Sequence, residues 1–211
     1  MQDKRTILIA GIPRSGTTLC CQLMNTIPNT IALHEPIPSQ SLTNLSGDEA
    51  VKAIKDFSDY SRQQALEKSK VQTKQVGGKI PSNPVKESPG ELRREHVSLD
   101  HIPVNKMLSP NFALVIKHNA LFTSLLESLI RDFPCFAIIR NPLATMASWQ
   151  TVDFPIHDGH VPMGEYFDED LKAKLFSLSS IIDRQICILR WFFQMFQKHL
   201  DRRQVMRYED I

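Results

Sequence analysis

Four apolar runs, each bounded by polar or turn-forming residues, recur along the chain and predict buried β-strands. They cover residues 7–10, 31–33, 112–116 and 134–139, and residues 204–210 predict a last strand. Stretches with the 3.6-residue spacing of amphipathic helices separate most of these runs. An alternation of strands and helices is typical of a parallel sheet with right-handed crossovers. We therefore predict an α/β fold in three α/β/α layers, with a central parallel sheet of about five strands.

The predicted helices follow the strands and carry their apolar positions on one face. The first helix has Leu19, Cys20, Leu23, Met24 and Ile27 on that face, and a proline at position 28 ends its pattern. A second amphipathic stretch covers residues 48–68, and others follow the runs at 112–116 and 134–139. A long amphipathic pattern spans residues 170–200. We expect most of the aromatic side chains of this last helix to belong to the core.

The pattern weakens between residues 38 and 110, apart from the helical stretch already named. Two adjacent glycines at 77–78 and four prolines at 81, 84, 89 and 103 indicate loops. Long irregular stretches inside compact domains are usually binding loops or mobile covers. We interpret residues 38–110 as an acceptor-binding insertion in a single domain that spans residues 1–211. A solvated surface insertion is the alternative.

A glycine-containing turn, Gly11-Ile12-Pro13-Arg14-Ser15-Gly16-Thr17-Thr18, joins the first strand to the first helix. Backbone N–H groups converge in such a loop, and the helix N-terminus attracts anions, so the expected ligand is a phosphate. A nucleotide triphosphatase has Lys directly after the second glycine, where this chain has Thr17. The cation is instead Arg14, whose planar guanidinium binds oxyanions in a bidentate manner. The loop favours a nucleotide whose transferred group differs from a γ-phosphate; a purely structural turn is the alternative.

Charged residues follow the other strands at their carboxyl ends. Glu35 follows the run at 31–33, Lys117 follows 112–116, and Arg140 follows 134–139. In an open α/β sheet, ligands bind at the carboxyl ends of the strands. Cations and a carboxylate there suit the transfer of an anionic group from a nucleotide to a hydroxyl, with the carboxylate accepting the proton. Taken singly, each of these residues could also be a surface charge at a strand end.

Composition narrows the functional classes. The chain has 211 residues, is 42% hydrophobic and 23% charged, and carries a formal net charge of +2. These values are typical of one soluble domain and argue against a nucleic-acid partner. No apolar run is long enough to cross a membrane, and residues 1–5 contain no signal-peptide core. The four cysteines lie in apolar contexts without metal spacing, so we expect reduced core thiols, no metal site and a cytoplasmic protein.

Several of these segments resemble motifs of the sulfotransferase family. Residues 13–19 resemble its 5′-phosphosulfate-binding loop. Residues 140–149 resemble its 3′-phosphate motif, in which an Arg and a Ser eight positions later, here Arg140 and Ser148, bind the 3′-phosphate of 3′-phosphoadenosine 5′-phosphosulfate (PAPS). Residues 207–211 resemble a later strand whose tyrosine, here Tyr208, lies near the adenine. The resemblance covers residues 6–35 and 112–150, with a smaller match at 204–211.

The resemblance implies a PAPS-dependent sulfotransferase with a P-loop-type fold. His34-Glu35-Pro36 and Lys117 stand where the carbohydrate- and tyrosyl-protein-like branches carry the catalytic base and a lysine on the transferred sulfuryl group. The implied catalytic residues are Glu35, Arg14 and Lys117. The implied donor-binding residues are Arg14, Ser15, Gly16, Thr17, Thr18, Arg140, Ser148 and Tyr208. The scheme needs no metal.

Some alternatives stay open at this point. The cytosolic small-molecule branch usually has Lys in place of Arg14 and a catalytic histidine, so the match favours Glu35 as the base. The acceptor is a sugar, a lipid or another small alcohol, and the sequence does not choose among them. A small-molecule kinase that uses ATP and a non-catalytic nucleotide-binding module are the alternative functions. Family members generally continue past residue 211, so we expect a missing C-terminal part or an unusually short member.

Overall fold

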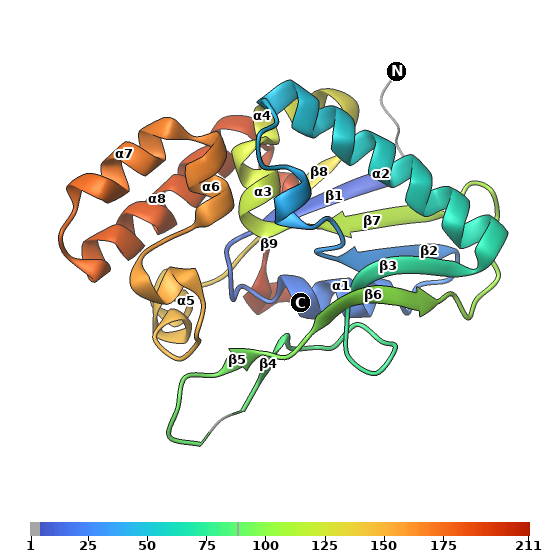
Figure 1. Ribbon diagram of the computed structural model, residues 1–211, viewed down its shortest axis with the longest axis horizontal. Helices are drawn as coiled ribbons and strands as arrows, with labels where there is room; N and C mark the ends of the chain where they lie inside the picture. Colours follow the sequence, from blue (N-terminus) through green and yellow to red (C-terminus); the bar gives the residue numbers. More distant parts are fainter. Residues whose placement is uncertain (1–4, 88) are drawn as a thin grey trace.

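A five-stranded parallel sheet forms the centre of the computed structural model, which describes residues 5–87 and 89–211 (Figure 1). Its strand order is β2-β7-β1-β8-β9, and all of the neighbouring pairs are parallel. The strands are β1 (Thr6–Gly11), β2 (Thr30–His34), β7 (Ala113–Lys117), β8 (Cys135–Ile139) and β9 (Val205–Arg207). The predicted α/β fold with about five parallel strands is confirmed. We predicted that residues 1–5 contain no signal-peptide core. Residues 1–4 of that segment lie outside the described part of the chain.

Strand β1 occupies the middle of the sheet, with β7 on one side and β8 on the other. Leu8 pairs with Ile116 of β7, and Ala10 pairs with Ala137 of β8. After β1 the chain forms β2 at one edge, then β7 between β2 and β1, and then crosses to β8 on the other side of β1. The carboxyl end of β1 is therefore the point where the strand order reverses. Ligands of open α/β sheets bind at such a point.

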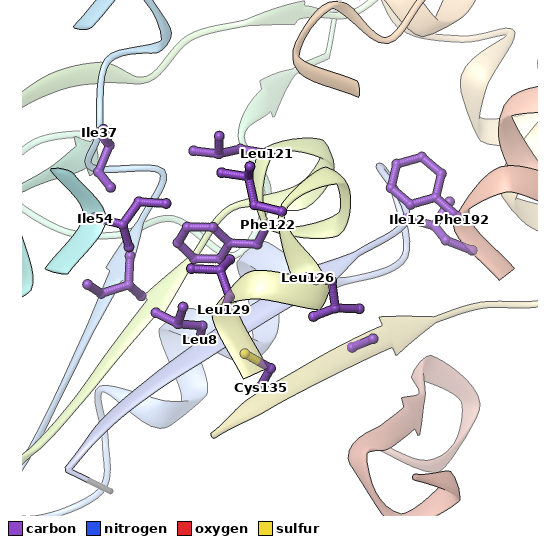
Figure 2. Close-up of a cluster of buried hydrophobic side chains, with 14 of the residues drawn as sticks. Leu8, Ile12, Ile37, Ile54, Leu121, Phe122, Leu126, Leu129, Cys135 and Phe192 are labelled. Atoms are coloured by element: carbon purple, nitrogen blue, oxygen red, sulfur yellow. The ribbon is translucent and has the colours of Figure 1, made fainter. Parts of the chain in front are cut away.

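Helices cover both faces of the sheet (Figure 1). Helix α1 (Thr17–Met24) lies on one face, and α2 (Gly47–Lys68), α3 (Asn119–Ser124) and α4 (Leu126–Asp132) lie on the other. Figure 2 shows Phe122, Leu126 and Leu129 of α3 and α4 packed over Leu8 of β1. Ile9, the next residue of β1, belongs to the smaller core cluster that includes Cys21 of α1. Burial on both faces explains why the strands read as continuous apolar runs.

Three of the predicted helices differ from the structure. The helix expected after residues 112–116 is two helices, α3 and α4, which are separated at Leu125. The pattern at 170–200 is two helices, α7 (Glu169–Ser177) and α8 (Ile181–His199), because the Ser180 hydroxyl accepts a hydrogen bond from the Asp183 N–H and starts a new helix. Helix α1 ends at Met24, and Ile27 is 50% exposed. The Asn25 side chain exchanges hydrogen bonds with the backbone of Ala32 in β2, which ties the chain to the sheet at the end of α1.

The segment between α2 and β7 contains strands that the sequence pattern did not indicate. Strand β3 (Lys70–Gln75) pairs antiparallel with β6 (Ser98–Pro103), and β4 (Val85–Lys86) pairs antiparallel with β5 (Arg94–Glu95). Figure 1 shows β3 and β6 beside β2. The Thr73 hydroxyl of β3 accepts a hydrogen bond from the His34 N–H of β2 at 2.8 Å. This contact places the segment beside the carboxyl end of the sheet.

The remaining helices follow β8. Helix α5 (Pro142–Trp149) begins after Asn141, whose side chain accepts hydrogen bonds from the N–H groups of Leu143 and Ala144. Helix α6 (Pro162–Phe167) packs against α3. Among the described residues, no helix is both long and apolar enough to span a bilayer.

Candidate active site

A cleft of about 780 Å³ is lined by residues that follow all five strands of the central sheet. The loop after β1 contributes Pro13 to Thr18 except Ser15, and Arg140 and Tyr208 follow β8 and β9. The lining includes eight of the ten residues that the sequence singled out: Arg14, Gly16, Thr17, Thr18, Glu35, Lys117, Arg140 and Tyr208. Parallel strands end at one edge of the sheet, so residues far apart in sequence meet there.

The loop between β1 and α1 leaves the start of the helix open toward the cleft. Gly16 is the residue before α1 and has a φ of 84°, and no side chain within the described residues caps the first turn. The first-turn N–H groups and the helix dipole therefore form an anion-binding site. A Cβ atom at Gly16 would lie 2.3 Å from Cδ2 of Tyr208, so only glycine fits beneath this ring. Tyr208 itself begins the 3₁₀ turn η4 (Tyr208–Asp210), where we predicted a strand.

Ser15 has a different surrounding from its neighbours in the loop. Its side chain is fully buried, and its hydroxyl donates a hydrogen bond to the carbonyl oxygen of Ile138 in β8 at 2.9 Å. This side chain holds the loop against the sheet and does not line the cleft. Its position in the loop was the reason for placing it among the residues that bind the sulfuryl donor.

Two arginines join the loop to the segment after β8. The Arg14 Nε donates a hydrogen bond to the Ser148 hydroxyl at 3.3 Å, and the Arg140 Nη1 donates one to the carbonyl oxygen of Arg14, also at 3.3 Å. The Arg140 guanidinium lies over the Tyr208 ring, 4.8 Å from its centroid. The two segments that carry the predicted phosphate contacts are therefore adjacent.

The insertion adds a hydrogen bond and a nearby charge to this arginine cluster, and the sequence analysis missed both. The Asn83 Oδ1 accepts a hydrogen bond from the Arg14 Nη1 at 3.1 Å, and Arg93 contributes a further positive charge. Burial, together with the charges of Arg93 and Arg140, lowers the pKa of Arg14 to about 10. An anion bound among these cations would relieve their mutual repulsion. Asn83 and Arg93 lie in a loop-like stretch, where no residue pattern marked them.

The Glu35 carboxylate is held by lysines on two different strands. Its Oε1 accepts a hydrogen bond from the Lys117 Nζ at 2.6 Å, and its Oε2 accepts one from the Lys74 Nζ at 3.0 Å. Burial alone would raise the pKa of Glu35, but the charges of Lys117 and Lys74 outweigh it and hold this pKa well below its usual range. The carboxylate is therefore ionised, which is the form that can accept a proton.

Two histidines beside Glu35 stay neutral. Burial and the charge of Lys117 lower the pKa of His34 to about 2, and burial lowers the pKa of His118 to about 3. The His118 Nε2 accepts a hydrogen bond from the Ile37 N–H at 3.1 Å, which fixes the chain after Glu35.

These histidines should make the free energy of unfolding depend on pH. The unfolded chain has ordinary histidine pKa values near about 6.5, so it binds more protons than the folded protein as the pH falls below that value. The free energy of unfolding is therefore highest at and above neutral pH. At about pH 5.5 it should be lower by about 1.4 kcal/mol for each buried histidine. The depressed pKa of Glu35 acts only at lower pH, below about 4.3. Urea unfolding at the two pH values measures the difference.

A histidine variant separates this effect from other titrations. His118→Gln keeps an acceptor for the Ile37 N–H, so we expect a smaller loss of unfolding free energy between neutral and acidic pH than in the wild type. His96→Gln, which changes an exposed histidine, should keep the wild-type dependence. A wild-type pH dependence in His118→Gln would contradict the prediction.

Possible metal ligands and thiols were compared across the described residues. In the stretches 5–87 and 89–211, no group of three or more His, Cys, Asp or Glu side chains is arranged to hold a metal ion. All four cysteines are free thiols, and Cys20, Cys21 and Cys135 are buried. Burial raises the pKa of Cys135 to about 12.

The strand order and the anion-binding loop after β1 define a nucleotide-binding α/β protein with a P-loop-type fold. A comparison with protein-family models adds the family. The model of the sulfotransferase domain matches residues 4–211, and the chain therefore belongs to this family. It is a PAPS-dependent sulfotransferase, which transfers a sulfuryl group to a hydroxyl acceptor. A search of curated proteins found no match to the chain.

Proposed function

We propose that the cleft binds PAPS between its two arginine-containing segments and transfers the sulfuryl group to an acceptor activated by Glu35. The observation that carries the proposal is the position of the Glu35–Lys117 ion pair, which lines the same cleft as the loop after β1. An anion site, a cation and a proton acceptor are then available in one cavity. These are the groups that transfer of an anionic group to a hydroxyl requires.

The donor has two anionic ends, and the cleft offers two sets of cationic contacts. In the proposal, Arg14 and the N–H groups from Gly16 to Thr18 bind the 5′-phosphosulfate. Arg140 and Ser148 bind the 3′-phosphate, and Tyr208 lies near the adenine. The support is that Arg14, Arg140 and Ser148 form one hydrogen-bonded cluster with no carboxylate partner within hydrogen-bond distance among the described residues.

The transfer step is an in-line displacement at sulfur. The acceptor oxygen forms a bond to sulfur while the bond between sulfur and the bridging oxygen of the 5′-phosphate breaks. The acceptor proton passes to the Glu35 carboxylate, and 3′-phosphoadenosine 5′-phosphate leaves with the bridging electron pair. Arg14 and Lys117 stabilise the negative charge on the sulfuryl and bridging oxygens. Most of the rate enhancement comes from positioning and electrostatics.

The acceptor site is proposed to include residues 38–110. This stretch contributes Lys74, Asn83, Glu95 and Leu99 to the lining of the cleft, which supports a role in acceptor binding. Apolar side chains from other segments, among them Ile37 and Met163, line the same cavity. The proposed acceptor is a small molecule or glycan with a free hydroxyl, such as a sugar, a lipid or another alcohol.

A transfer assay tests the proposal directly. The purified protein is incubated with PAPS labelled in the sulfuryl group and with a panel of hydroxyl acceptors: a monosaccharide, a phenol, a long-chain alcohol and a tyrosine peptide. We expect label on at least one acceptor and tighter calorimetric binding of 3′-phosphoadenosine 5′-phosphate than of ATP with magnesium. Preferential binding of ATP with magnesium, with no labelled product, would refute the proposed function.

A further inference from the structure

A lysine from the insertion contacts the carboxylate that we propose as the base. Lys74 of β3 places its Nζ 3.0 Å from the Oε2 of Glu35 and 2.8 Å from the Oε1 of Glu95. The other oxygen of Glu35 is bonded to Lys117 of β7. Each oxygen of the carboxylate therefore has its own lysine, and the two lysines come from different sheets.

The backbone around Lys74 is fixed to the backbone around Glu35. The Thr73 hydroxyl accepts a hydrogen bond from the His34 N–H at 2.8 Å. The Gln72 side-chain amide donates one to the carbonyl oxygen of Pro36, also at 2.8 Å. Three consecutive side chains of β3 thus contact three consecutive residues at the end of β2. These contacts hold Lys74 in a defined position, whereas the side chains of a typical surface ion pair are mobile.

We propose that Lys74 is a positioning residue for sulfuryl transfer, which holds the Glu35 carboxylate oriented and ionised while Lys117 turns to the donor. This inference rests on the proposed role of Glu35 as the base. The Lys117 ammonium group cannot bind the Glu35 carboxylate and the sulfuryl oxygens at full strength at the same time. A second cation is therefore needed to keep the base in place. Glu95 of β5 in turn holds Lys74, which makes the insertion part of the catalytic arrangement.

The charged and titratable groups around Glu35 come from several elements, and they define what a substitution of Lys74 should change. They are Lys117 and His118 at the end of β7, His34 of β2, Cys21 of α1, Lys74 of β3 and, behind it, Glu95 of β5. The histidines are neutral near pH 7 because burial lowers their pKa values. Lys74 and Lys117 are therefore the two full positive charges beside the carboxylate.

The first test measures the ionisation of Glu35 without any acceptor. The ¹³C signal of its carboxyl group is followed by NMR as the pH is lowered. Lys74→Met, which keeps most of the aliphatic stem, should raise the pKa of Glu35 by roughly 1 to 3 units, as expected for loss of one adjacent opposite charge. Lys74→Gln provides a second neutral variant in case the first does not fold. Lys74→Arg should keep the low value.

The matched control is Lys52→Met, which removes a lysine from an exposed ion pair with Asp56 on α2. Its Glu35 titration should equal that of the wild type. A titration of Glu35 that is unchanged in both neutral Lys74 variants would overturn the inference. A higher pKa that persists in Lys74→Arg would also overturn it, since the effect would then not come from the charge.

The second test is kinetic and uses the labelled PAPS assay with an acceptor that gives product. The acid limb of kcat/KM reports the ionisation of the base in the free enzyme. In Lys74→Met it should move to higher pH by the shift that NMR records, with about a tenfold loss one unit below the new pKa. A limb that stays in place while the NMR value moves would overturn the inference. Retained turnover in Glu35→Gln would instead refute the proposed base, so the two failures are distinguishable.

Discussion

Glu35→Gln is expected to lower turnover by roughly 100- to 10,000-fold, which is the usual contribution of a positioned general base. The amide keeps the shape of the side chain, but its single oxygen can accept a hydrogen bond from only one of the two lysines, and it cannot take the acceptor proton. Binding of 3′-phosphoadenosine 5′-phosphate should change little, because the hydrogen bonds of the carboxylate go to lysines and not to Arg14 or Arg140. Initial rates with labelled PAPS and calorimetry with the product nucleotide measure the two effects.

A matched control shows whether the loss is specific to this site. Glu67→Gln makes the same chemical change on the exposed side of α2, where the carboxylate contacts only Gln63 among the described residues. Its turnover and nucleotide affinity should equal those of the wild type. A large loss of nucleotide affinity in Glu35→Gln, with turnover retained, would remove Glu35 from the role of base and give it a part in donor binding.

The sheet and most of the cleft could be predicted from the sequence for one physical reason. Parallel strands buried on both faces are continuous apolar runs, and their carboxyl ends must meet at one edge. A charged residue directly after each run, such as Glu35 or Arg140, can therefore be assigned to a common site without knowing the three-dimensional structure. Glu35 and Arg140, which were selected in this way, both line the cleft.

The contacts of the insertion could not be predicted in this way. Strands β3 and β6 are largely polar, and β6 is largely exposed, so no apolar alternation marks them. The Lys74–Glu35 ion pair joins residues 39 positions apart through side-chain hydrogen bonds between β2 and β3. Ser15 is a second example, since its place in a phosphate-loop pattern does not reveal that its hydroxyl donates a hydrogen bond to the carbonyl oxygen of Ile138. Both the Lys74–Glu35 ion pair and the Ser15 hydrogen bond depend on tertiary packing, which the local sequence pattern does not show.

Arg140→Ala is expected to weaken binding of 3′-phosphoadenosine 5′-phosphate by about 2 to 5 kcal/mol, or roughly 30- to 5,000-fold in Kd. The Arg140 guanidinium is oriented by the carbonyl oxygen of Arg14 and by the ring of Tyr208. A side chain held in this way loses little conformational freedom when it binds a phosphate. Its removal leaves the proposed site of the 3′-phosphate without its main cation. The loop after β1 stays available for the 5′-phosphate.

The comparison that identifies this role uses two nucleotides and two variants. The wild type should bind 3′-phosphoadenosine 5′-phosphate much more tightly than adenosine 5′-phosphate, and Arg140→Ala should remove most of that preference. Arg131→Ala, which changes an exposed arginine near the end of α4, should preserve it. Equal affinity of the wild type for both nucleotides would show that Arg140 and Ser148 do not bind a 3′-phosphate. The hydrogen bonds that join these residues to Arg14 would then serve only to stabilise the loop.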